Sequence, residues 1–139
     1  MKPPAPFETR PRRQQLLGVT LPAFGLGFVV GIALGLSAIA YVVLLVVAGL
    51  GGIAAGMEHR RPGIAALRGL MGGAIFGIAL LVGHWVLGRD ATVALPSPEA
   101  LEVLITAVAS VPLALLGVAL RRLLEARVNG GQRSASSPT

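Results

Sequence analysis

Side chains able to do chemistry are scarce in this sequence. Two histidines, His59 and His84, are the only side chains that titrate near neutral pH, and cysteine is absent. His84 lies in an uncharged stretch, where an ionisable group is a functional candidate. Its position near the end of that stretch also suits a neutral interfacial histidine that hydrogen-bonds to water or to a neighbour. His59, beside Glu58 and Arg60, is expected to be an ordinary loop residue.

These residues do not make a catalytic set. A metal site usually needs three or four converging ligands, which two separated histidines cannot supply. The glycines lie in apolar stretches and not in a phosphate-binding loop between a strand and a helix. No acidic residue occurs between Glu8 and Glu58, which separates the chain from the small multidrug transporters and their first-helix carboxylate. We therefore expect no catalytic residue, no cofactor, no metal and no enzymatic activity.

The elements that carry the histidines are expected to be membrane helices. Apolar residues make up 54% of the 139-residue chain and charged residues only 13%, against about a quarter in soluble domains. Charge is absent from residues 14–57, 69–88 and 103–120. A single helix over residues 16–57 would be roughly 63 Å long, about twice the hydrocarbon thickness. The small residues at 35–38 predict a turn that divides this run into two crossings.

The fold class predicted is an all-α, four-helix transmembrane bundle built from two consecutive hairpins. The helices are expected at about residues 15–36, 38–57, 64–88 and 98–128, within a transmembrane domain over 16–128. Ser97 and Pro98 suit the N-cap and first position of the fourth helix, and the Asn-Gly-Gly at 129–131 suits its end. Residues 1–15 are expected to be a flexible basic arm, and residues 129–139 a disordered tail.

Charge predicts the orientation. With four crossings, 11 of the 12 basic residues lie on one side, which the tendency of basic loops to stay inside makes the cytoplasm, with both termini there. The paired arginines that define this side are Arg12, Arg13, Arg60, Arg61, Arg121 and Arg122. Tyr41 and Trp85, with His84, are expected as anchors at the outer interface. A cleavable signal ending at the Ala-Ile-Ala of residues 38–40 is the competing interpretation, although the apolar segment before it is long for one.

Glycine spacing predicts close helix packing. Small residues four apart share a helix face and let another backbone approach. The candidate packing positions are Gly27, Gly31, Gly35, Gly52, Gly56, Gly69, Gly73, Gly77 and Gly117. These faces pack either within one chain or against a second chain, and spacing alone does not decide between the two. The match of residues 31–34 with 77–80 is compatible with a duplicated hairpin and also with chance.

Two proline residues interrupt the predicted helices. Pro22 and Pro112 each remove one helical hydrogen bond, and the carbonyl released is able to line a cavity, although simple packing also accounts for both. The polar residues are spread over three of the predicted helices without an obvious line: Thr20, Ser37, Tyr41, Thr106 and Ser110. This spread favours an accessory subunit over an ion pore.

The glycine-rich run at residues 49–58, with Gly63 and residues 68–73, resembles small glycine-rich polytopic membrane proteins of unknown function from bacteria and archaea. That resemblance implies a helical hairpin and no activity. The function expected is a non-enzymatic structural or accessory subunit, which packs in the bilayer against itself or a larger complex. The alternative is an oligomeric channel, holin-like pore or carrier for a small solute or ion. The basic arm is a candidate for contact with anionic lipid, and nucleic acid is not an expected partner, because the basic residues are split among three segments.

Overall fold

Residues 11–135, which a computed structural model describes without the side chains of residues 12, 15 and 128–135, form four α-helices. They are α1 (Arg12–Leu34), α2 (Ala38–Met57), α3 (Pro62–Leu87) and α4 (Leu101–Ala135). Each contains an apolar stretch long enough to cross a bilayer: Leu16–Leu34, Ala38–Met57, Pro62–Leu87 and Leu101–Arg127. The predicted all-helical class is confirmed, and the chain is a multi-pass membrane protein by helix length and composition.

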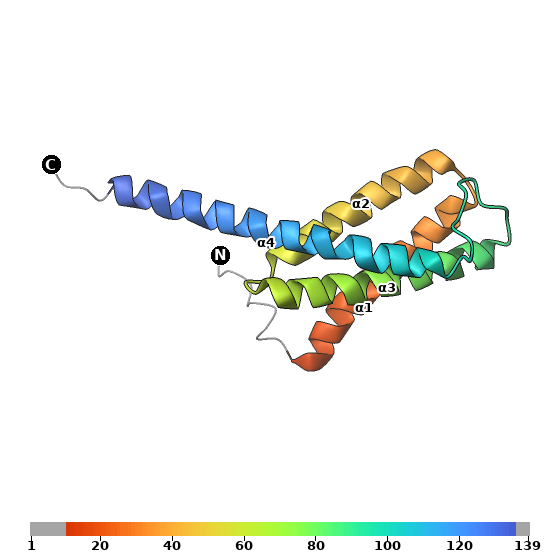
Figure 1. Ribbon diagram of the computed structural model, residues 1–139, viewed down its shortest axis with the longest axis horizontal. Helices are drawn as coiled ribbons and strands as arrows, with labels where there is room; N and C mark the ends of the chain where they lie inside the picture. The colour runs from red at the N-terminus through yellow and green to blue at the C-terminus, as the bar shows by residue number, and fades with distance from the viewer. Residues whose placement is uncertain (1–10, 136–139) are drawn as a thin grey trace.

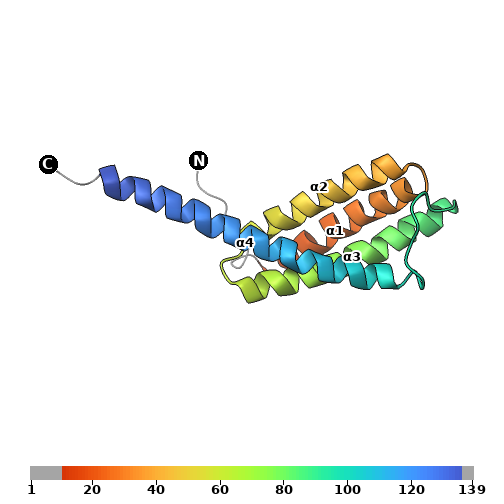
Figure 2. The same ribbon diagram turned by 45° about the horizontal axis from the view of Figure 1, so that its top comes forward.

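The helices pack in the cyclic order α1, α3, α4, α2 (Figures 1 and 2). The most extensive contacts join α1 to α3 and α3 to α4, and α2 packs mainly on α4. The consecutive helices α1 and α2 touch much less. They meet at their connecting turn and diverge toward the other end of the bundle (Figure 1). The first hairpin is therefore open, whereas the second is closed.

Two connections follow local rules of helix capping. Ser37 is the N-cap of α2, and the Ala40 N–H donates a 3.4 Å hydrogen bond to its Oγ. Gly88 ends α3 in the left-handed conformation at φ 63°, which glycine adopts without steric cost. The turn predicted at residues 35–38 is present, and α2 has the predicted bounds.

Other helix ends differ from the prediction. The helix α1 begins at Arg12, inside the expected arm, and α3 begins with Pro62 at its first turn. The fourth helix begins at Leu101 and not at Pro98, because the chain first makes turns in which the Leu101 and Glu102 N–H groups donate to the Pro98 and Glu99 carbonyls. The remaining parts of the predicted arm and tail, residues 1–10 and 136–139, lie outside the described residues.

The end of α4 was also predicted wrongly. The helix continues through the expected Asn-Gly-Gly stop to Ala135 and extends past the other helices (Figure 1). A glycine within a helix costs only about 1 kcal/mol relative to alanine, so a helix can continue through it, and among the described glycines only Gly88 has a positive φ. Residues 129–135 of the predicted tail are therefore helical.

The most tightly packed core lies at the end where α1 turns into α2. Val30 and Leu34 of α1, Tyr41 of α2 and Leu80 and Leu81 of α3 form it. The segment between α3 and α4 closes over this core, with three partly buried side chains, Ala91, Val93 and Leu95. This end of the bundle positions the helices, and the opposite end is where α1 and α2 separate.

Candidate functional site

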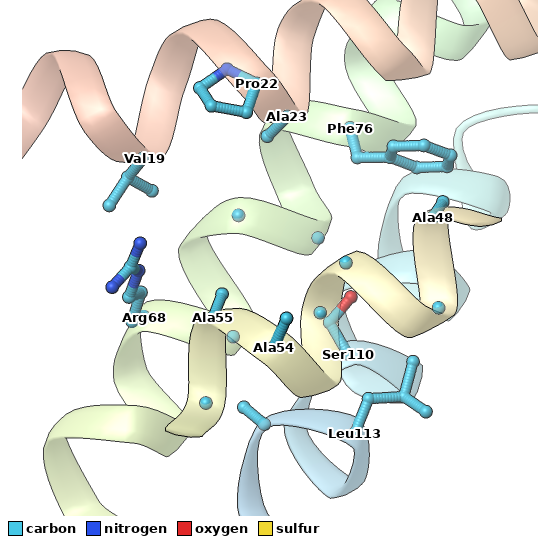
Figure 3. A pocket seen from close by; sticks show the side chains of 18 of the residues that line it. Val19, Pro22, Ala23, Ala48, Ala54, Ala55, Arg68, Phe76, Ser110 and Leu113 are labelled. Atoms are coloured by element: carbon cyan, nitrogen blue, oxygen red, sulfur yellow. The ribbon is translucent and has the colours of Figure 1, made fainter. Parts of the chain in front are cut away.

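A cavity of about 500 Å³ lies between the diverging helices α1 and α2, with α3 and α4 as its floor. Figure 3 shows side chains from all four helices facing this space. The principal lining residues are Gly18, Val19, Pro22 and Ala23 of α1, Ala48, Gly51, Ala54 and Ala55 of α2, Arg68, Gly72 and Phe76 of α3, and Ser110 and Leu113 of α4. The cavity exists because the helices around it present small side chains where they separate.

Glycines divide into two groups around this cavity. A Cβ added at Gly72 or Gly51 would meet no atom within 4 Å, so the missing side chains there leave open volume. At Gly31 and Gly27 of α1, by contrast, an added Cβ would overlap the backbone of α3, at Leu80 and Phe76. Some glycines thus bring helices into contact, and others widen the space between them.

The predicted packing glycines lie mostly at contacts within the chain. On α3, a Cβ at Gly69, Gly73 or Gly77 would overlap atoms of α4. On α2 and α4, Gly56 and Gly117 face each other's helix backbone. Gly35 meets the Leu87 side chain, and Gly52 has ordinary contact with Leu113 at 3.7 Å. Within the described part of the chain, these faces are therefore occupied by its own helices.

One proline helps to shape the cavity wall. Pro22 and Gly18 both line the cavity, and they are one helical turn apart. Because proline has no N–H, the Gly18 carbonyl lacks the helical hydrogen bond it would otherwise accept. Pro112, the second interior proline, is exposed and does not line this space. Of these two prolines, Pro22 lines the cavity and Pro112 does not.

The two hydroxyls on the floor belong to α4 and are turned toward their own helix. The Thr106 Oγ1 donates to the Glu102 carbonyl at 2.8 Å, and the Ser110 Oγ donates to the Thr106 carbonyl at 2.6 Å. Such bonds satisfy a hydroxyl without a second helix. The floor of the cavity therefore offers mainly apolar contact, as its glycine and alanine residues also do.

Charged groups gather where the cavity reaches the α2–α3 connection. The Arg68 guanidinium Nη1 lies 2.8 Å from Glu58 Oε2 and 2.9 Å from His59 Nε2. Arginine can only donate, so a hydrogen bond between these two groups has His59 Nε2 as its acceptor. The Arg68 side chain is only 14% exposed and lines the cavity.

The prediction that His59 is an ordinary loop residue was wrong. It does lie in the connection between α2 and α3, but its side chain is only 1% exposed and contacts Arg68. The useful signal in the sequence was Arg68 itself. A cation inside an apolar helix needs a partner, and the short connection behind it offers Glu58 and His59 as the nearest candidates.

A second, smaller basic pocket lies on the other side of His59. Arg60, Arg121, Arg122 and Glu125 line it, with His59 and Val118. Arg121 spans the gap between helices, because its Nη1 donates to the Met57 carbonyl at the end of α2 at 3.0 Å, and its Nε bonds Glu125 at 2.8 Å. A cation at a helix C-terminus satisfies a carbonyl and opposes the negative end of the helix dipole.

The three predicted anchors differ in exposure. Trp85 is 62% exposed, and its Nε1 donates to Glu99 Oε2 at 2.9 Å. Tyr41 and His84 are each 8% exposed, so little of either ring is available to lipid headgroups. Among the described residues, His84 Nδ1 has no hydrogen-bond partner. No group of three metal-ligating side chains occurs in residues 11–135.

Comparisons of the chain with protein-family profiles, with curated proteins and with solved structures find no match.

Proposed function

We propose that this chain is a non-enzymatic multi-pass membrane protein that binds an elongated apolar or amphipathic molecule between α1 and α2. The cavity of about 500 Å³ carries the proposal. Small-molecule sites are typically roughly 300–1,000 Å³ in volume and mostly apolar. The apolar lining favours a guest of this kind over the small solute or ion of the carrier alternative, and the cavity favours binding of a guest over packing through the glycines alone.

The volume favours a slender guest over a partner helix. A helix about 10 Å wide fills roughly 420 Å³ in each turn, so a cavity of about 500 Å³ holds little more than one turn. A flexible chain needs much less width. The separation of α1 and α2 gives such a molecule a path from the bilayer into the cavity.

The test is labelling by an uncharged diazirine alkane in phosphatidylcholine nanodiscs. Irradiation is expected to label the cavity-floor residues Phe76 and Leu113, identified by peptide mass spectrometry. Gly72→Leu places a side chain in the cavity without a backbone clash and should remove most of that labelling. Gly25→Leu is the matched control, because Gly25 is equally uncrowded but does not line the cavity. Equal labelling of both variants would contradict the proposal.

The exposed apolar surface of α2 supports a second proposal, the accessory-subunit function. Only 6% of its apolar span is buried. The exposed side chains on it include Val42, Val43, Val46, Val47 and Leu50. A partner would use this surface, because the glycine faces meet neighbouring helices within the chain. Gentle solubilisation followed by native mass determination tests it, since a stoichiometric larger complex supports it and a lone monomer opposes it.

We further propose that both termini face the cytoplasm of the inner membrane. The starts of α1 and α3 and the distal part of α4 lie at one end of the bundle (Figure 1), together with nine described arginines. These are Arg12, Arg13, Arg60, Arg61, Arg68, Arg121, Arg122, Arg127 and Arg133. Arg89 is the basic residue at the opposite end. This charge difference is what the positive-inside tendency requires.

A further inference from the structure

We infer that the molecule held between α1 and α2 is one acyl chain of an anionic membrane lipid, with the lipid phosphate paired to Arg68 at the charged end of the cavity. The inference rests on the proposed function and adds the chemical class of the guest. Two features that meet in one cavity support it: a long apolar wall and, at one end of that wall, the guanidinium of Arg68, whose side chain is 14% exposed.

The apolar part matches one chain in volume. A methylene group takes up about the volume of a water molecule in the liquid, roughly 30 Å³, so about 500 Å³ accommodates on the order of 16 of them. That is one lipid tail and not two. The second tail would stay in the bilayer, beside the exposed apolar side chains of α1 and α2 such as Leu21 and Leu50.

The polar part matches an anion. In Figure 3 the Arg68 guanidinium points toward Val19, across the space between α1 and α2. Its carboxylate partner Glu58 is 46% exposed, so this carboxylate can turn into water when a phosphate takes its place on the guanidinium. A guanidinium can donate two parallel hydrogen bonds to a phosphate.

The bilayer is the source that the geometry favours. The cavity opens between two membrane-spanning helices, where lipid already lies, and its charged end is at the level of the basic residues. Basic pockets between transmembrane helices on the cytoplasmic side are sites where anionic headgroups bind. A soluble anion would meet the same arginine but would leave the apolar wall uncovered.

The experiment measures which lipids remain on the protein after release from nanodiscs that contain phosphatidylglycerol and phosphatidylcholine in equal amounts with identical chains. Native mass spectrometry is expected to show about a fivefold preference for phosphatidylglycerol, the preference that one basic residue near the surface provides. Arg68→Gln should reduce the preference to parity. Arg61→Gln, which removes the same charge from an exposed residue outside the cavity, should keep it.

A second variant, with the opposite expected effect, keeps the test decisive if Arg68→Gln fails to fold. Glu58→Gln removes the carboxylate that competes with the phosphate, and it should raise the preference above that of the unmodified protein. Parity in the unmodified protein, or equal preferences in Arg68→Gln and Arg61→Gln, would overturn the inference. Inorganic phosphate bound to the unmodified protein and lost in Arg68→Gln, with no preference between the two lipids, would also overturn it by identifying a soluble anion as the ligand of Arg68.

The two proposals fail in distinguishable ways. In one outcome the diazirine alkane labels Phe76, Gly72→Leu removes this labelling, and the two lipids are retained equally. The proposal of an apolar guest is then supported, and the inference of an anionic lipid is rejected. If Gly72→Leu changes neither the labelling nor the lipid retained, the cavity has no guest and both proposals are rejected.

Discussion

Thr92 donates two hydrogen bonds to the carbonyl of Leu34, one from its hydroxyl at 2.6 Å and one from its backbone N–H at 2.9 Å. Leu34 is the last residue of α1, where a carbonyl has no partner within its own helix. Thr92 lies in the segment between α3 and α4. This pair therefore fastens the second hairpin over the end of the first, opposite the open end of the bundle.

Replacing Thr92 tests how much this contact stabilises the fold. Thr92→Val removes the hydroxyl donor and keeps the shape, so we expect a loss of about 1 kcal/mol in the free energy of unfolding. Unfolding in mixed micelles, followed by circular dichroism, measures it. Thr92→Ser keeps the hydroxyl and should be nearly as stable as the unmodified protein. Equal stability of the two variants would show that the hydroxyl contributes nothing.

The crossing of α1 and α3 depends on the absence of a side chain at one glycine. An added methyl group in Gly31→Ala would overlap the Leu80 carbonyl, so the helices must move apart at a cost of roughly 1–3 kcal/mol. Gly25→Ala, in the same helix, meets no atom within 4 Å and should instead be neutral or slightly stabilising. Thermal unfolding in detergent compares the two. The prediction fails if both variants shift the midpoint in the same direction.

The end of α3 requires a left-handed residue. Gly88→Ala places a Cβ at φ 63°, and we expect about 1 kcal/mol of destabilisation although no atom lies near it. Gly63→Ala adds the same methyl group in open space within a helical turn and should have no such cost. Denaturant midpoints measured in the same micelles separate a backbone effect from a packing effect.

The proposed orientation is open to a direct test, because the chain has no cysteine. Single cysteines at the exposed positions Ser97 and Gly63 lie in the α3–α4 segment and at the start of α3. A membrane-impermeant maleimide added to intact cells is expected to label Ser97→Cys and not Gly63→Cys. After permeabilisation both should react. The reverse pattern in intact cells would place both termini outside.

The positions of the helices could be predicted because the sequence signals that determine them are local. Runs without charge, one small-residue turn and the capping residue Ser37 fix where α1 turns into α2. Boundaries were predicted less well where two local signals compete, as at the start of α4. There Ser97 and Pro98 suit a helix start, but the chain makes separate turns before Leu101.

The cavity was not predictable, because it depends on which helices touch. Gly31 of α1 and Gly73 of α3 each belong to a series of glycines four residues apart, so the sequence predicts the same packing role for both. Only the packing of all four helices shows that these two meet a neighbour while Gly72 faces open volume. The burial of His59 likewise depends on where the α2–α3 connection folds relative to Arg68.

The sparse contact between α1 and α2 has a consequence for biosynthesis. In a chain that enters the membrane from its N-terminus, α1 and α2 arrive first, but the main partner of α1 is α3 and the main partner of α2 is α4. Neither half of the chain is thus a complete folding unit. After insertion, α1 and α2 are therefore surrounded by lipid until α3 and α4 have been synthesised. A ribosome that stalled before α4 would leave α2 without the helix on which it packs.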